Sequence, residues 1–368
     1  MILSERPGAP APRWIDVVEP TLASEAGHCA ALFHGLRGAA PELGLRLWID
    51  RRARLPWTDA HTQLRPWFSR RLRKLQALML YRRLLRAGAA VLVPTASYFD
   101  LRALDLVSGG ALAPGRAYLY FHKLRIDVPR ARALAQLARR QPALELFGTS
   151  DEIVQRLHAA GFAQVRRVLP VLAALRPAAP VPVGFRTLLS AGAARADKGF
   201  AHIVDLVELL QRTGATLPIA VQTSGDHYGR YDERTQADLT RLRACRYPGL
   251  TLIDDTLDGA QYAALFPGSV CLQPYERAEY ADKMSAVTFD ALRAGAPIVT
   301  VRGTTMADIV ERSGAGVVIE QAGGAALLQA AQAAVAGYPG LQARALAAGA
   351  QYQPEASWAP LVERLRAR

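Results

Sequence analysis

Cysteine is scarce in this 368-residue chain, and its three thiols, Cys29, Cys245 and Cys271, are widely spaced. No CxxC or Cys/His cluster occurs, which argues against a zinc site, and an odd thiol count indicates a reducing, cytoplasmic compartment. No segment offers about 18 consecutive apolar residues, so we expect no transmembrane helix. The N-terminus lacks the apolar run of a secretory signal. The absence of GxGxxG disfavours a dinucleotide site.

Acidic residues are few in the first part of the chain. Net charge is +13 overall. Residues 1–150 hold 23 Lys/Arg and 11 Asp/Glu, a balance of +12, whereas residues 151–368 hold 22 and 21, a balance of +1. The first part is therefore expected to face a negatively charged partner or to be kept away from one.

Short apolar strands alternate with longer helical segments in two successive runs, a pattern typical of parallel sheets covered by helices. Half of the residues are apolar and the length exceeds one ordinary core, so two domains are expected. Four prolines between Pro170 and Pro182 predict a linker. We therefore predict an N-terminal domain over 1–182, a C-terminal domain over 183–345 and a helical segment over 346–368.

The predicted elements can be given in order. Strands are predicted at Trp14–Val18, Leu45–Ile49, Ala90–Val93, Ala117–Phe121, Leu144–Phe147, Val165–Val168, Thr187–Ser190, Pro218–Gln222, Thr251–Ile253, Val270–Gln273 and Ile298–Val301. Helices are predicted at His28–Ala40, Trp67–Ala87, Arg130–Gln141, Asp151–Ala160, Ala201–Thr213, Arg234–Ala244, Gly259–Phe266, Gly323–Ala336 and Ser357–Arg368.

The most informative stretch is Leu272–Pro297. An apolar strand leads into a polar loop with Asp282, and a helix carrying Asp290 follows, with seven residues between the two acids. Gly-Ala-Pro then precedes a second apolar strand. This order resembles the donor-site signature of family-4 glycosyltransferases with the GT-B fold. The resemblance implies two doubly wound, Rossmann-like parallel-sheet domains facing a cleft, and an enzyme that takes a sugar from a nucleotide-sugar.

The resemblance implies roles for this stretch. Met284, Ser285 and Ala286 would stand at a helix N-terminus, where free amides and the helix dipole favour phosphate. Asp290 would accept hydrogen bonds from ribose hydroxyls, and Asp282 from sugar hydroxyls. The family usually has Glu at both acidic positions, which is one methylene longer. Glu276 and Glu279 are alternatives to Asp282, and two solvated helix acids are the alternative to a site.

A second loop, at residues 190–200, contains a glycine turn at Gly192 and the cations Arg195 and Lys198. Both cations could form charge-assisted hydrogen bonds with a diphosphate. The resemblance implies that they bind the nucleotide diphosphate and stabilise it as a leaving group, so Arg195, Lys198, Asp282 and His122 are the predicted catalytic residues. A helix-entry loop with solvated charges is the alternative.

The first half holds the predicted acceptor-binding residues. Gly27 and His28 follow the first strand, where related enzymes carry a loop that approaches the donor and the acceptor. His122 ends a strand, and related enzymes often have a histidine there that points at the donor sugar; a structural histidine is the alternative. Lys123 and Arg125 could bind acceptor or phosphate.

Asp254–Asp258, DDTLD, follows a strand and is loosely similar to a metal-binding DxD sequence. The resemblance argues against a metal, because such enzymes use helix dipoles and basic residues instead. We predict no metal and no cofactor, with the nucleotide-sugar as the donor substrate.

Arg65–Arg86 holds eight Arg/Lys and no acid, with apolar residues at helical spacing. A cationic helix with an apolar side is typical of segments that lie on anionic lipid. An ordinary helix with its arginines in water is the alternative, and nucleic acid is a weaker one, because no stacking motif or helix-turn-helix pattern occurs.

The resemblance to family-4 glycosyltransferases implies a metal-independent, retaining hexosyltransferase. The acceptor would be a glycan, a lipid-linked glycan or a glycoprotein of the bacterial cell surface, with lipopolysaccharide among the options. The enzyme would be cytoplasmic or peripheral on the inner membrane face. A sugar-nucleotide epimerase and a basic, non-catalytic binding protein are the alternatives.

Overall fold

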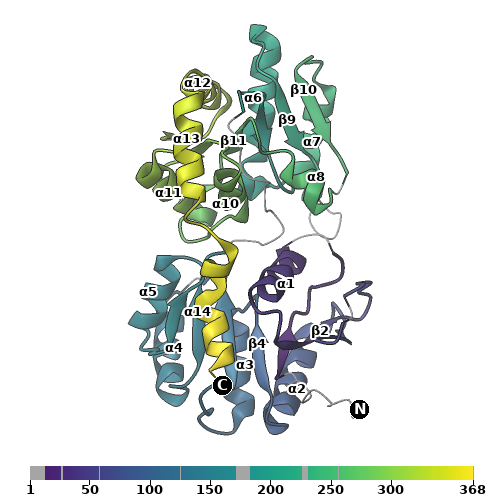
Figure 1. Ribbon diagram of the computed structural model, residues 1–368, viewed down its shortest axis with the longest axis vertical. Helices are drawn as coiled ribbons and strands as arrows, with labels where there is room; N and C mark the ends of the chain where they lie inside the picture. Colours follow the sequence, from purple (N-terminus) through teal and green to yellow (C-terminus); the bar gives the residue numbers. More distant parts are fainter. Residues whose placement is uncertain are drawn as a thin grey trace, which may run out of the picture.

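The computed structural model describes residues 13–25, 28–57, 59–124, 126–170, 183–225, 231–255 and 257–367. Two α/β domains lie one above the other in Figure 1, each built on a parallel sheet. The predicted fold class is therefore confirmed. Residues 171–182 of the predicted linker lie outside the described residues. No helix in the described part of the chain is long and apolar enough to span a bilayer.

The first domain has a seven-stranded sheet in the order β3-β2-β1-β4-β5-β6-β7. Its strands are β1 (Trp14–Val18), β2 (Gly44–Asp50), β3 (Thr62–Phe68), β4 (Ala90–Val93), β5 (Ala117–Phe121), β6 (Glu145–Gly148) and β7 (Val165–Arg167). Its helices are α1 (His28–Ala39), α2 (Arg73–Arg86), α3 (Tyr98–Ser108), α4 (Val128–Arg140) and α5 (Asp151–Ala159). Helices α2 to α5 pack on one face of the sheet and α1 packs on the other.

The second domain has a six-stranded sheet in the order β10-β9-β8-β11-β12-β13. Its strands are β8 (Thr187–Ser190), β9 (Ile219–Gln222), β10 (Leu250–Ile253), β11 (Ser269–Gln273), β12 (Ile298–Val301) and β13 (Gly316–Ile319). Its helices are the 3-10 turn η1 (Ala196–Lys198), α6 (Phe200–Thr213), α7 (Glu233–Ala244), α8 (Gly259–Ala263), α9 (Arg277–Tyr280), α10 (Ala286–Arg293), α11 (Thr305–Ser313), α12 (Gly324–Ala336) and α13 (Tyr338–Gly349). Apolar side chains of α6, α7 and α12 cover one face, and those of α10 and α11 cover the other.

The last helix, α14 (Pro354–Arg366), returns to the first domain and runs along it in Figure 1. Trp358 is almost fully buried there among side chains of α1 and β5. Its ring lies 5.8 Å from that of Tyr120, and the Tyr118 hydroxyl donates a hydrogen bond to the Arg364 carbonyl at 3.1 Å. Helix α14 is thus part of the first domain's core although it comes last in the sequence.

The predicted helix Trp67–Ala87 is wrong at its start. Residues Thr62–Phe68 instead form β3, which pairs with β2 at the sheet edge. Pro66 explains this, because proline disfavours the helical conformation of the residue before it and is tolerated in an edge strand. The cationic segment is therefore a strand end, a short connection and the shorter helix α2.

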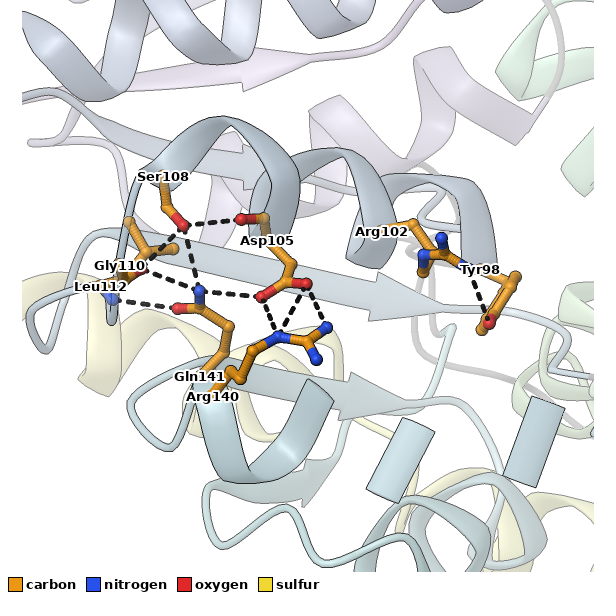
Figure 2. Close-up of polar contacts among 8 residues, drawn as sticks. All are labelled: Tyr98, Arg102, Asp105, Ser108, Gly110, Leu112, Arg140 and Gln141. Carbon is orange, nitrogen blue, oxygen red and sulfur yellow. Dashed lines mark hydrogen bonds and ion pairs between the residues drawn. The ribbon is translucent and has the colours of Figure 1, made fainter. Parts of the chain in front are cut away.

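Helix α3 was not predicted, although Ser97 and Asp100 form a capping box at its start. Figure 2 shows how α3 is tied to α4: Asp105 accepts hydrogen bonds from Arg140 and from the buried Gln141. Gln141 also accepts from the Leu112 amide at 2.9 Å. These bonds hold α3 and α4 as one rigid surface beside α2.

Candidate functional site

The strand orders place a topological switch point in each sheet. In the second domain it lies between β8 and β11, which are neighbours in the sheet although three helices and two strands separate them in the sequence. The chain leaves these two strands toward opposite sides, so the loops at their carboxyl ends border a crevice where ligands bind in such sheets. These are the loops at residues 191–199 and 274–285, the two that the sequence singled out.

Two glycines let these loops approach closely. Gly192 has φ +90°, and a Cβ there would lie 2.5 Å from the Lys198 Nζ. Gly199 has φ +67°, and a Cβ there would lie 1.9 Å from the carbonyl oxygen of Pro274. A side chain at position 199 would therefore push the two loops apart, whereas one at position 192 would strain the backbone and displace the Lys198 ammonium. The predicted role of Gly192 in donor binding remains a prediction.

Lys198 brings a positive charge into this crevice. Its Nζ lies near Val287 in the first turn of α10, because both contact the space over Gly192. Desolvation, helped by the charge of Arg195 and opposed by that of Asp197, lowers the pKa of Lys198 to about 8. Among the described residues no carboxylate forms an ion pair with Lys198. It is a desolvated cation that an anionic ligand would stabilise.

Arg195 already has a partner in its own loop, Asp197. Its Nε donates to Asp197 at 2.8 Å, and a second nitrogen forms an ion pair with the same carboxylate. Lys283 also approaches Asp197, at 3.4 Å. Burial raises the pKa of Asp197, but Arg195 and Lys283 together lower it by more. The pKa of Asp197 is therefore below its usual value. Besides Lys198, the crevice therefore holds one anion, Asp197, between two cations, Arg195 from the same loop and Lys283 from the loop at residues 274–285.

The N-terminus of α10 faces the same crevice. Ser285 is its N-cap residue and has an extended backbone, but its side chain accepts no capping hydrogen bond. First-turn amides are therefore not satisfied by a side chain. Ala286 packs against apolar residues of the first domain, and Met284, just before the helix, is half-buried. Ser285 and Ala286 have small side chains, which add little bulk beside these amides.

Asp290 lies one turn into α10 and is buried. Its Oδ1 has no hydrogen-bond partner among the described residues. Burial raises the pKa of Asp290 to about 8, and Arg293 and Tyr262 offset only part of this rise. An unsatisfied buried carboxyl oxygen is costly, so this position is explained best by a ligand that supplies a hydroxyl donor.

Asp282 is turned toward the first domain. Its carboxylate forms an ion pair with Arg156 of α5, and its backbone oxygen accepts a hydrogen bond from Ser150 at 2.9 Å. The alternative acid Glu279 forms an ion pair with Lys123, a predicted acceptor residue. The predicted contacts of Asp282 with sugar and of Lys123 with acceptor remain predictions.

His122 directly follows β5 at the carboxyl edge of the first sheet. Its Nε2 lies 2.9 Å from the Pro94 carbonyl oxygen, and its ring lies 4.4 Å from that of Tyr120. Its predicted role at the sugar stays a prediction. Gly27 and Arg125 lie outside the described residues, as does the side chain of His28.

The acidic residues Asp254 and Asp258 form hydrogen bonds within the second domain. Asp254 accepts from Thr223 at 2.7 Å and from Arg243 at 2.8 Å, while Asp258 caps α8 by accepting from the Gln261 amide. Within the described ranges, no group of three or more His, Cys, Asp or Glu is placed to hold a metal.

The sequence reading missed Tyr275, Lys283 and Arg156. The Lys198 Nζ lies 5.7 Å from the centre of the Tyr275 ring, and the Lys283 Nζ lies 4.4 Å from that of Tyr280. The sequence did hold a signal for Lys283. Lysine is rare in this chain, where arginine is the usual basic residue, and three of its four lysines stand at positions 123, 198 and 283. Arg156 had no such signal, because only the fold brings it to Asp282.

No family model matches the sequence, and no curated relative does. Solved structures do match over nearly the whole chain. Sucrose-phosphate synthase from Thermosynechococcus elongatus is 15% identical, with a TM-score of 0.70 over 96% of this chain and 98% of that one. HepE of Anabaena, in complex with UDP-glucose, is 11% identical, with a TM-score of 0.67 over 96% and 100%.

WaaG, a glycosyltransferase involved in lipopolysaccharide biosynthesis, is 12% identical, with a TM-score of 0.66 over 95% and 98%. At such identities the likeness concerns the path of the backbone, and here it extends over both domains. The chain therefore has the GT-B fold of these glycosyltransferases.

Proposed function

We propose that this protein is a glycosyltransferase that takes a sugar from a nucleotide-sugar. The observation that carries the proposal is the Lys198 ammonium, which lies in the switch-point crevice beside the start of α10 with no carboxylate partner among the described residues. The fold adds support, because two proteins of similar structure, one of them HepE, were solved with UDP or a UDP-sugar. UDP is therefore the first nucleotide to test.

In this proposal the diphosphate lies between Lys198 and the amides of Ser285 and Ala286, with Gly192 leaving the room for it. Arg195 would contribute its remaining N–H groups. The orphaned Oδ1 of Asp290 would accept a hydrogen bond from a ribose hydroxyl. As the bond to the sugar breaks, negative charge grows on the diphosphate, and these fixed donors stabilise it without a metal.

The remaining features of the proposal rest on the family resemblance. The sugar is a hexose, transfer retains the anomeric configuration as in family 4, and His122 faces the sugar. Gly27, His28, Lys123 and Arg125 belong to the acceptor side, in the first domain. Because Arg156 already engages the carboxylate of Asp282, we do not assign that group to the sugar.

A donor screen tests the proposal. We expect one class among UDP-, GDP-, dTDP- and ADP-sugars to raise the melting temperature and to be hydrolysed slowly without acceptor. Binding at 100 times the Kd stabilises a protein by about 2.7 kcal/mol, which a melting curve resolves easily. The same screen on Asp290→Asn, which keeps the volume of the side chain, should show weaker binding. A folded protein that responds to none of these donors would contradict the proposal.

We further propose that the acceptor lies on an anionic membrane, as a lipid-linked cell-surface glycan. Helix α2 presents its buried residues, such as Leu80 and Tyr81, to the core, and exposes Leu72, Leu75 and Met79, which are about half accessible. Exposed cations surround this apolar stripe; they are Arg70, Arg71, Arg73, Lys74, Arg82, Arg83 and Arg86. Exposed leucines among cations fit an anionic lipid surface better than water.

The position of this surface also fits. Because α2 follows β3, its first turn lies at the carboxyl edge of the first sheet, the edge that borders the cleft. Lys74 lies over the Phe99 ring of α3, which links the surface to the rigid α3–α4 pair of Figure 2. A membrane bound here would present its lipid headgroups at the mouth of the cleft.

Vesicle binding tests this surface. We expect the protein to sediment with vesicles containing anionic phosphatidylglycerol, not with pure phosphatidylcholine, and to be released by salt, since each surface cation contributes about 1 kcal/mol. The double variant Leu72→Ser/Leu75→Ser should bind at least about tenfold more weakly, because each inserted leucine adds roughly 1.5 kcal/mol or more. Leu106→Ser, at an exposed position on α3, is the matched control. Equal binding of the double variant and the control would contradict the assignment.

A further inference from the structure

The loop that leads into α10 is held by the first domain at two points. Asp282 is one of them, through its carboxylate and its backbone oxygen. Glu279, in α9, is the other, through its ion pair with Lys123. The loop at residues 274–285 therefore belongs to the second domain by sequence and is fixed in part by the first.

We propose that Arg156 and Ser150 clamp Asp282 and thereby position the start of α10 for the donor. The clamp role rests on this structure alone, whereas its effect on the donor rests on the proposed function. Asp282 is then a positioning residue that links domain closure to assembly of the diphosphate site, rather than a group that touches the sugar.

The clamping groups are themselves held in place. Ser150 is the N-cap of α5 and accepts a hydrogen bond from the Ile153 amide at 3.3 Å, which orients its hydroxyl. Arg156 donates a second hydrogen bond to the Leu124 carbonyl oxygen at 3.1 Å, so its guanidinium is fixed at the end of β5. Side chains held in this way lose little conformational entropy when the domains meet.

The burial of Asp282 makes the clamp energetically significant. Its side chain is 11% exposed, whereas that of Arg156 is 40% exposed. Removing the arginine would leave a nearly buried carboxylate without its countercharge, which costs more than the loss of a surface ion pair. The domains would then open to let water reach Asp282.

Opening would reach the donor site through a short path. Three residues separate Asp282 from the first residue of α10, and the Thr305 hydroxyl donates to the Lys283 carbonyl between them at 2.8 Å. Lys283 also contacts Asp197, the ion-pair partner of Arg195. A shift of Asp282 therefore moves both sides of the diphosphate crevice, and by linkage a bound donor favours the clamped state.

The experiment combines Arg156→Met, Asp282→Asn and the double variant, measured by small-angle scattering without ligand and by titration with the donor found in the screen. Arg156→Met should increase the radius of gyration and weaken donor binding, by about tenfold if the coupling is typical. The double variant should be no worse than either single one, and Arg156→Lys should restore part of the affinity. Arg167→Met, which breaks the exposed ion pair with Asp151 inside the first domain, should change neither quantity.

Two results would overturn the proposal. One is an unchanged radius of gyration in Arg156→Met. The other is a much larger loss of donor affinity in Asp282→Asn than in Arg156→Met, with additive effects in the double variant, because that result means direct contact with the donor. If the wild-type protein binds no nucleotide-sugar, the proposed function fails, and the scattering data still decide whether the clamp exists.

Discussion

Replacing Lys198 with Met should reduce affinity for the donor nucleotide by at least about 100-fold, or roughly 2.7 kcal/mol. Met keeps most of the side-chain volume beside Gly192 and the Tyr275 ring, so the loop should keep its shape. What is lost is the one cation of this loop that the described carboxylates leave without an ion pair. Titration calorimetry with the nucleoside diphosphate measures the loss, and Lys74→Met, an exposed lysine on α2, is the control.

The pH dependence of binding separates a charge effect from a shape effect. The pKa of Lys198 is lowered to about 8 in the free protein, and a bound diphosphate must raise it, because the anion favours the protonated form. Above pH 8 binding therefore requires proton uptake, and affinity should fall by up to about tenfold per pH unit. Lys198→Met should lack this decline. An equal decline in the variant and the wild type would assign the effect to another group.

Replacing Trp358 with Ala should destabilise the first domain by about 3 to 5 kcal/mol, the usual range for a large buried aromatic side chain. Trp358 is 1% exposed and fills the space between α1 and β5. Its indole lies so close to Gly35 that a Cβ there would be 2.8 Å from the Trp358 Nε1. Loss of the indole should leave a cavity in this part of the core, so α14 should be held less tightly.

Calorimetric unfolding should show this loss in one transition only. The second domain has its own core, formed by residues of β8 to β13 and their helices, and its transition should stay unchanged. Leu106→Ala, at a residue that is 73% exposed, should alter neither transition. A shift below about 1 kcal/mol for Trp358→Ala, the size of an ordinary surface effect, would show that α14 does not contribute to the first domain's stability.

Buried strands could be predicted from the sequence, whereas an exposed edge strand could not. Strands such as Ala117–Phe121 and Thr187–Ser190 were predicted with their bounds, because a parallel strand covered on both faces is a continuous apolar run. Edge strand β3 was missed, since it is half-exposed and carries Pro66. Helix α3 was missed, although the capping box of Ser97 and Asp100 marks its start.

For the candidate site, the sequence indicated individual residues, and the fold showed which of them lie together. Gly192, Lys198, Ser285 and Asp290 could be singled out because their spacing from a strand end is a local property of the chain. Their convergence needed the strand order, since only the switch point between β8 and β11 makes the two loops neighbours. That Asp290 has an orphaned oxygen likewise depends on what packs around it.

The sequence alone determined the alternation of strands and helices, the two-domain fold and the loops that carry charge, because each depends on hydrophobic period and turn chemistry within a short segment. Only the tertiary structure decided the partners of those charges. It paired Asp282 with Arg156, 126 residues earlier, and Glu279 with Lys123, 156 residues earlier. Ion pairs act over a few ångströms, and distance along the chain says nothing about distance in space until the sheets have formed.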